Sequence, residues 1–308
     1  MKYIEDYKKT FNCNNSDEVF KVFIDTLKIT NTKWNYFVNW EKVFENKKNV
    51  EISLNLLNYL IGKENIEKEF IDLIMQYPEI VIILPGLIAC RQKKLYILNS
   101  YSHSGFNYKK ITFSNKKSVT LEEAEFFLEF IKNTGFLELL KSKNIKNVVD
   151  YFIGVEVGLD SNGRKNRGGA MMEEITEYFI EDLCKKTGFS YLSQVSSTKI
   201  KNEWNIELKS DKSSRRIDFA INNGENLYLI ETNFYGGGGS KLKSTAGEYK
   251  SMYDWWKNDN KKFIWITDGV GWKTTQRPLR ETFEYTDFIL NLEMVRLGLL
   301  ESIIRGNH

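Results

Sequence analysis

Histidine, cysteine and proline are scarce in this chain of 308 residues, which contains two His, three Cys and three Pro. The cysteines Cys13, Cys90 and Cys184 are far apart, and one of the histidines is His308. A structural zinc site needs Cys and His ligands at close spacing, so the sequence excludes one. A small odd number of cysteines suits a reducing cytoplasm, in which each acts as a small buried hydrophobic residue.

Long hydrophobic segments are also missing. The longest apolar run, Ile80–Ala89, is interrupted by Pro85 and is too short to span a bilayer. The first ten residues contain no apolar segment, so we expect no signal peptide. A hydrophobic content of 42% is nevertheless enough for a folded core. These features predict a cytoplasmic protein without a membrane partner.

The charges nearly balance, because 44 Lys and Arg face 41 Asp and Glu, which gives a formal net charge of +3. No polybasic tail therefore marks a nucleic-acid partner. A protein with an acidic metal site and a basic cleft would show the same balance, so the local distribution of charge is more informative than its sum.

The first half of the chain has mainly helical patterns. Apolar residues recur at helical spacing in segments 19–27 and 54–61, so residues 1 to about 75 are predicted to be helical. The segment Asn31–Trp40 concentrates aromatic residues beside Lys33. Such a cluster can stack on bases, but a small aromatic core is the favoured interpretation.

Two strands, a loop and a further helix are expected next. The strands are predicted at Glu79–Leu84 and Lys94–Leu98, and Ser100–Asn107 is predicted to be a polar loop. Within that loop, a surface position for His103 is favoured over a role as general base. The helix is predicted at Leu121–Lys141, with Thr120 or Ser118 as its N-cap.

The stretch 141–148 is rich in Asn and Lys and predicts a linker. We therefore divide the chain into a mostly helical region, 1–150, and a second part, 151–308. In the second part, strands near 189–195 and 204–208 and at Lys262–Thr267 alternate with helices, so the fold class is α/β. Helices are expected at Ala170–Lys186, ending at Gly188, and from Ser244 to about Lys257, where Tyr249 lies on the apolar face.

Two acidic residues stand out in the segment that follows. The apolar segments Ile217–Ile221 and Leu227–Ile230 are joined by Asn222-Asn223-Gly224, which predicts a β-hairpin. Asp218 lies in the first strand and Glu231 ends the second. Two carboxylates at one sheet edge repel each other unless a cation lies between them, and Mg²⁺ suits such oxygen ligands. This arrangement is typical of metal-dependent phosphodiester hydrolysis.

The same hairpin resembles the motif of the PD-(D/E)xK nucleases, with Asp218, Glu231 and Asn233 at the motif positions. Ile217 replaces the usual Pro, and Asn233 stands where the superfamily usually has Lys. The resemblance implies that Asp218 and Glu231 hold Mg²⁺ and that Asn233, or alternatively Lys241, orients the water or the phosphate. It also implies an additional metal ligand from the preceding helix, for which Glu173 and Glu177 are the first candidates.

Three longer blocks resemble the DpnII/MboI family of type II restriction endonucleases. They are Gly158–Gly169, Ile230–Lys243 and Gly271–Glu281. The resemblance implies a Mg²⁺-dependent endonuclease that cuts double-stranded DNA before the G of the palindrome GATC. It also implies that residues 151–308 form the nuclease core, a restriction endonuclease-like fold with a mixed central sheet flanked by helices. A palindromic target implies a homodimer, and the host DNA would be protected by an adenine methyltransferase.

These blocks also supply the candidate DNA contacts. A basic loop, Asp160–Gly169, precedes the predicted helix and could bind phosphate or read guanine, although a solvated linker is the alternative. After the Gly236–Gly239 run, Ser240 precedes Lys241, whereas a phosphate-binding P-loop needs Gly-Lys-(Ser/Thr). The four glycines instead predict a mobile loop close to the DNA backbone or a hairpin tip without function. The cations concerned are Arg164, Lys165, Arg167, Lys241 and Lys243.

A last basic loop, Gly271–Arg280, follows the predicted strand Lys262–Thr267. It contributes Lys273, Arg277 and Arg280 as DNA contacts, together with Trp272. Asp268, just before it, is interpreted as a turn residue, and Pro278 is expected to begin the final helix.

Two other functions fit the same sequence. A DNA-binding protein that has lost cleavage would explain Asn233 in place of Lys. A nuclease of the same fold without sequence preference would keep Asp218 and Glu231 but would give a smear of products instead of discrete fragments.

Overall fold

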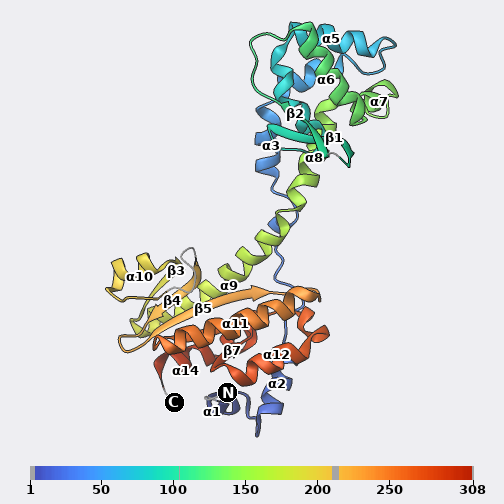
Figure 1. Cartoon of the computed structure of the whole chain (residues 1–308). Coiled ribbons are helices and arrows are strands. Elements are labelled where there is room, and N and C mark those ends of the chain that lie inside the picture. The colour runs from blue at the N-terminus through green and yellow to red at the C-terminus, as the bar shows by residue number, and fades with distance from the viewer. Residues whose placement is uncertain (1–3, 104, 210–214, 307–308) are drawn as a thin grey trace. The chain divides into compact units, whose positions relative to one another are not determined.

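A computed structural model gives the structure of the chain, in which residues 4–103, 105–209 and 215–306 are described (Figure 1). The chain forms two compact units. The sheet unit comprises Met1–Trp34 and Lys165–His308, and the helical unit comprises Asn35–Arg164. We describe each unit separately.

The sheet unit contains a five-stranded mixed sheet in the order β3-β4-β5-β6-β7. Neighbouring strands are antiparallel from β3 to β5 and parallel from β5 to β7. The predicted α/β class, a mixed sheet flanked by helices, is confirmed. The strands are β3 (Ser190–Val195), β4 (Ile217–Asn222), β5 (Leu227–Phe234), β6 (Lys262–Asp268) and β7 (Phe288–Leu290).

Helices from both ends of the sequence pack around this sheet. Tyr7 is fully buried, and its hydroxyl both donates to the carbonyl of Ile289 and accepts from its N–H, which fixes the first helix to β7. The helices of this unit are α1 (Ile4–Phe11), α2 (Ser16–Asp25), α9 (Arg164–Thr187), α10 (Ser197–Trp204), α11 (Ser240–Asn258), η3 (Val270–Thr274), α12 (Gln276–Tyr285), α13 (Leu292–Arg296) and α14 (Leu299–Arg305).

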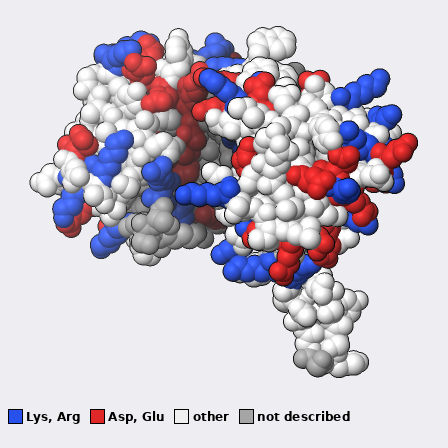
Figure 2. Space-filling view, turned by 90° about the horizontal axis from the view of Figure 1, so that it is seen from above, with Lys and Arg blue, Asp and Glu red and all other residues white. Residues whose placement is uncertain are grey.

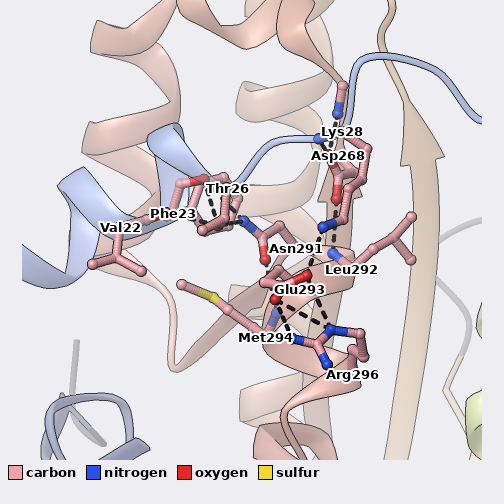
Figure 3. A network of polar contacts seen from close by, with 11 residues as sticks. Val22, Phe23, Thr26, Lys28, Asp268, Asn291, Leu292, Glu293, Met294 and Arg296 are labelled. Atoms are coloured by element: carbon pink, nitrogen blue, oxygen red, sulfur yellow. Dashed lines mark hydrogen bonds and ion pairs between the residues drawn. The ribbon is translucent and has the colours of Figure 1, made fainter. Parts of the chain in front are cut away.

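Asp268 organises the end of β6. Its buried carboxylate accepts the backbone N–H groups of Lys28 at 2.7 Å, Leu292 at 2.8 Å and Gly269 at 2.6 Å (Figure 3). Burial raises the pKa of Asp268, and the three N–H donors oppose that rise. The interpretation of Asp268 as a turn residue was therefore too narrow, because it also joins the segment after α2 to α13.

The helical unit has its own hydrophobic core, formed by its helices and by the inner end of a two-stranded sheet. The β1–β2 pair is antiparallel and separate from the five-stranded sheet. The elements are η1 (Trp34–Tyr36), α3 (Trp40–Lys48), α4 (Glu51–Asn58), α5 (Ile66–Gln76), η2 (Pro78–Ile88), β1 (Lys94–Ser102), β2 (Gly105–Thr112), α6 (Leu121–Asn133), α7 (Phe136–Lys141) and α8 (Val148–Ser161).

Several predicted elements of this unit were wrong. Glu79–Leu84 lies in the 3-10 helix η2, because a short buried apolar run fits a helix as well as a strand. The predicted helix Leu121–Lys141 is divided in two at Gly135, which has a φ of +81°. Its predicted cap is confirmed, since Thr120 and Glu123 form a capping box.

The polar loop expected at Ser100–Asn107 was also wrong. Strand β1 continues to Ser102 and β2 begins at Gly105, so most of the segment is paired. His103 is exposed, as predicted. The strand expected at 204–208 does not form, because α10 ends at Trp204 and Asn205 takes a left-handed conformation.

The aromatic segment Asn31–Trp40 does not form the small core that was favoured. Trp34 is 93% exposed, and Phe37 and Trp40 are about half exposed.

The sequence predicted a domain boundary at residue 150, and this boundary stays a prediction. The two compact units of the structure have other bounds. Residues 1–34 cluster with the sheet unit because α1 and α2 pack on its core. The stretch 141–148, predicted to be a linker, lies inside the helical unit.

No helix among the described residues is long and apolar enough to cross a membrane.

Candidate active site

Asp218 and Glu231 lie side by side in the predicted hairpin. The β4–β5 ladder ends with the pair Phe219 and Ile230, so the next residues on each strand, Asp218 and Glu231, are cross-strand neighbours. The ladder stops there because the Asp218 carboxylate accepts the Thr232 N–H at 2.7 Å and the Thr232 hydroxyl at 3.0 Å. The strand pairing therefore brings the two carboxylates to one position of the sheet, and the Thr232 backbone fixes that of Asp218.

Glu231 is the more strongly perturbed of the two. It is only 8% exposed, and its Oε1 atom is buried without a hydrogen-bond partner. Its Oε2 atom accepts a hydrogen bond from Tyr249 at 3.4 Å. Burial, and then the negative charge of Asp218, raise the pKa of Glu231 well above its usual value, while Arg215 and Tyr249 oppose the rise. Burial also raises the pKa of Asp218.

A chain of hydrogen bonds connects Glu231 to the interior. The Asn233 amide donates to the Tyr249 hydroxyl at 3.3 Å, and its carbonyl accepts from Thr267 at 2.5 Å. Thr267 in turn accepts from the indole N–H of Trp272 at 2.8 Å. Asn233 is therefore oriented on both sides, while the second hydrogen of its amide has no acceptor among the described residues.

Glu173 reaches the same centre from α9. Its carboxylate accepts from Gln194 at 2.6 Å, and burial, followed by the charge of Asp218, raises its pKa. Gln194 precedes Val195, which pairs with Ile217, so Gln194 lies opposite Asp218. Its φ of +49° is uncommon for a residue other than glycine and turns its amide away from the regular ladder.

Glu177 and Lys241 are less closely joined to this centre. Glu177 is one turn beyond Glu173 on α9 and accepts a long hydrogen bond of 3.5 Å from Tyr191. Lys241 is exposed in the first turn of α11, which begins at Ser240 instead of the expected Ser244. Among the residues described, no hydrogen bond or ion pair connects Lys241 to Asp218 or Glu231.

The basic loop predicted at Asp160–Gly169 is mostly helical. Helix α8 extends to Ser161 and α9 begins at Arg164, so the segment carries its cations on helical backbone. Arg164 donates to the carbonyl of Phe37 at 3.1 Å, and Lys165 is exposed. Arg167 is partly buried.

The glycine run is packed and does not form a free loop. A Cβ atom on Gly271 would come within 2.4 Å of the carbonyl oxygen of Gly237, so only glycine allows these two backbones to meet. The N–H of Gly271 also donates to Tyr235 at 2.8 Å. The exposed Lys241, Lys243 and Lys273 therefore lie on two segments that pack against each other.

The remaining residues of the last basic segment differ in exposure. Arg277 is exposed and pairs with Glu281 at 3.1 Å, whereas Arg280 pairs with Asp17 at 2.7 Å and lies over the Phe20 ring. Trp272 is fully buried and belongs to the hydrogen-bond chain of Asn233, so it is not a surface residue. Pro278 lies inside α12, which begins at Gln276, and β7, α13 and α14 follow it.

The surface charges are mixed. Lys and Arg are interspersed with Asp and Glu on the face shown in Figure 2, as the small net charge predicts. No single large basic surface is visible on that face, so DNA contacts have to be located residue by residue.

The residues present at the hairpin fit a divalent cation. In the described part of the chain, no three His, Cys, Asp or Glu side chains are placed so that they could hold a metal ion. Two adjacent carboxylates, with the Oε1 atom of Glu231 unpartnered, are nevertheless the donors that Mg²⁺ uses, because it commonly binds one or two carboxylates and keeps several waters.

Sequence patterns identified the two carboxylates but missed the residues that orient them. Thr232 holds Asp218, Tyr249 holds Glu231 and Asn233, and Gln194 holds Glu173. Tyr249 was predicted only as part of an apolar helix face. The unusual conformation of Gln194 leaves no signal in the sequence, whereas Thr232 could have been noted because it directly follows Glu231.

Comparison with known proteins gives one family. A family model described as DpnII restriction endonuclease matches residues 19–302. The type II restriction enzyme MjaIII of Methanocaldococcus jannaschii is 49% identical over 290 residues, which cover 92% of this chain and 99% of that enzyme. LlaDCHI of Lactococcus lactis subsp. cremoris is 40% identical over 292 residues, 94% of this chain and 95% of that enzyme. DpnII of Streptococcus pneumoniae is 36% identical over 289 residues, 92% of this chain and 98% of that enzyme.

Proposed function

The chain belongs to the DpnII restriction endonuclease family, and from this premise we propose that it cleaves double-stranded DNA at GATC in a Mg²⁺-dependent reaction. The observation that carries the proposal is the unpartnered buried oxygen of Glu231 beside Asp218. Such a pair is costly to keep ionised in the absence of a cation, so a site of this kind is more readily explained by chemistry than by stability.

Asp218 and Glu231 are the residues that would hold the cation, and Glu173 or Glu177 would contribute from α9. A bound divalent cation supplies activation of water and stabilisation of negative charge during in-line displacement at phosphorus. Thr232 and Tyr249 keep the two carboxylates in place, which preserves their orientation while DNA enters and leaves.

Asn233 is our first candidate to orient the attacking water or the scissile phosphate, with Lys241 as the alternative. Its amide is fixed by Thr267 and Tyr249, and one N–H remains to donate. An amide can orient a water but cannot neutralise the phosphate as the usual Lys does. We propose that the DNA is contacted by cations from other segments, namely Arg164, Lys165, Arg167, Lys241, Lys243, Lys273, Arg277 and Arg280.

The finer parts of the proposal are supported by the three sequence blocks Gly158–Gly169, Ile230–Lys243 and Gly271–Glu281. They imply the GATC target and a cut before the G. A palindrome is matched by a two-fold homodimer that brings one active site to each strand. A cytoplasmic restriction–modification system would pair the enzyme with an adenine methyltransferase that protects the same site.

Digestion of plasmid DNA tests this function. We expect discrete fragments from unmethylated DNA with Mg²⁺, with ends at GATC, and protection of adenine-methylated DNA. A gel shift without cleavage would favour a DNA-binding protein that has lost catalysis. A smear of products would favour a nuclease of the same fold without sequence preference. Fragments ending at another sequence would contradict the GATC assignment.

A further inference from the structure

A second β-hairpin, β1–β2 of the helical unit, lies in a stretch without acidic residues. Between Glu79 and Glu122 the sequence has no Asp or Glu, although the whole chain has 41 of them. The same stretch has seven Lys and Arg, which are Arg91, Lys93, Lys94, Lys109, Lys110, Lys116 and Lys117. A strictly one-signed segment in a chain of balanced charge points to a negatively charged partner.

Only the base of this hairpin is anchored. Ile111 and Phe113 are buried in the core of the helical unit, and Leu95 packs against them from β1. On the same inner face Lys109 pairs with Glu129 and lies over the Phe126 ring at 4.8 Å. Beyond these contacts the strands are exposed on both faces.

An irregularity in β1 gathers side chains on the outer face. Residues directly opposite on antiparallel strands share a face, so Tyr96 lies with Lys110 and Leu98 with Tyr108. The register shifts between Leu98 and Ser100, and the extra residue brings Tyr101 opposite Phe106. Without that shift, the alternation of the strand would place Tyr101 on the inner face.

The outer face therefore carries four aromatic rings and two cations. Tyr96 is 63% exposed, Tyr101 75%, Phe106 68% and Tyr108 57%. Exposed aromatic rings gathered on one face mark an interaction site more often than rings scattered singly over a surface.

The cations beside these rings are available for a partner. Lys94 and Lys110 belong to the same face, opposite Thr112 and Tyr96, and both are exposed. Neither has an ion pair among the described residues, and the same holds for Lys93 and Lys117. Lys109 and Lys116, in contrast, pair with acids of α6. The unpaired cations and the rings together form one basic, aromatic surface.

We propose that this outer face of β1–β2 is a DNA-contacting ribbon, a second surface that binds the duplex apart from the Asp218–Glu231 centre; the inference rests on the proposed function, in which DNA is the substrate. A two-stranded ribbon fits the width of the major groove. Lys94 and Lys110 contact phosphates, and the rings pack on sugars and base edges.

A second copy of the chain fits this surface less well. In a two-fold contact the same patch lies on both sides, so Lys94 and Lys110 would face like charges without any acid from the segment to balance them. Charge complementarity therefore favours DNA.

The inference is tested by measuring the binding of a labelled duplex that contains GATC. Anisotropy reports the binding, and Ca²⁺ replaces Mg²⁺ to prevent cleavage. The variants of the full chain are Lys94→Ala with Lys110→Ala, and Tyr101→Ala with Phe106→Ala. The matched control is Lys68→Ala with Lys141→Ala, which removes two exposed lysines from the same unit. All these side chains are exposed, so thermal melting should be unchanged and any loss of binding is not a loss of folding.

The lysine pair should weaken binding about tenfold and reduce the slope of log affinity against log salt by about 1.8, which corresponds to two lost phosphate contacts. The aromatic pair should weaken binding without changing that slope, and the control should do neither. Binding by both variants within twofold of wild type would overturn the inference. The inference would also be overturned if the aromatic variant had a lower oligomeric state but an unchanged affinity for DNA per protomer. That result would assign the surface to self-association. A wild-type protein that binds no duplex would refute the proposed function itself, and the inference with it.

Discussion

The two β-hairpins of this chain are built from similar residues and end in opposite environments. The β4–β5 hairpin is flanked by β3 and β6, and its apolar side chains are buried. The β1–β2 hairpin has no third strand among the described residues, and its aromatic side chains are exposed. The first holds the buried carboxylate of Glu231 beside the partly buried Asp218, whereas the second lies in a segment without acids. The surroundings of each hairpin therefore match the role proposed for it, which is catalysis for β4–β5 and DNA contact for β1–β2.

The largest expected difference concerns stability. Phe219 in β4 is 1% exposed and Phe106 in β2 is 68% exposed. Phe219→Ala should lower the free energy of unfolding by about 3–5 kcal/mol, because it removes a buried ring and leaves a cavity. Phe106→Ala should change it by less than about 0.5 kcal/mol. Urea denaturation measures both, and similar costs for the two substitutions would break the comparison.

The next largest effect concerns the hydrogen bond between Tyr249 and Glu231. Tyr249→Phe removes that bond and the one from Asn233, so cleavage should slow by about tenfold, the equivalent of about 1.4 kcal/mol. Single-turnover cleavage at saturating enzyme gives the rate. Tyr253→Phe on the same helix removes a hydroxyl that accepts from Lys257 and lies beside Asp287, so it serves as the control. Equal rates for the two variants would show that Tyr249 does not position the carboxylate.

A smaller effect is expected for Glu231→Gln, which should stabilise the metal-free protein instead of destabilising it. Burial and the neighbouring Asp218 raise the pKa of Glu231, so its folded state binds protons more readily than its unfolded state. The stability that the Glu231 carboxyl contributes is fully present below its pKa in the unfolded state. It is lost as the pH rises through its pKa in the folded state. Glu231→Gln should therefore stabilise the metal-free protein at pH 8 by about 1 kcal/mol. A destabilised variant at that pH would contradict the electrostatic account.

The smallest effect concerns the ion pairs near Asp268. Arg296, and then Lys28, lower the pKa of Glu293 to about 2 (Figure 3). A lowered pKa contributes stability that is present above the unfolded value near 4.5 and is lost as the pH falls toward about 2. Unfolding curves of wild type and Glu293→Gln should converge over that interval. A difference that stays constant with pH would show that Glu293 acts by packing alone.

Local signals in the sequence predicted the β4–β5 hairpin because every part of it is local. The Asn-Gly turn, the two apolar segments and the positions of Asp218 and Glu231 all lie within one short stretch. Thr232 lies in the same stretch, but the other partners that orient the carboxylates come from β3 and α11. No local pattern shows that Gln194 or Tyr249 would reach them. Those contacts depend on long-range packing, which the spacing of residues along the sequence does not reveal.

The second hairpin was half predicted for a related reason. Its first strand was expected at Lys94–Leu98, but the Ser, Asn and Gly residues that follow are typical of loops. They form paired strand because the ladder continues from its anchored base to Gly105, with one irregularity. Likewise, Glu79–Leu84 is buried as expected but helical, because burial alone does not select the backbone conformation.

The most direct test of the central claim is cleavage of GATC-containing DNA with Mg²⁺ by three variants under single-turnover conditions. Asp218→Asn and Glu231→Gln keep the size of the side chains but remove one carboxylate each, and Glu225→Gln removes an exposed carboxylate from the turn of the same hairpin. The account predicts a loss of about a thousandfold or more for the first two and a wild-type rate for Glu225→Gln. Cleavage by Asp218→Asn or Glu231→Gln at close to the wild-type rate would contradict it.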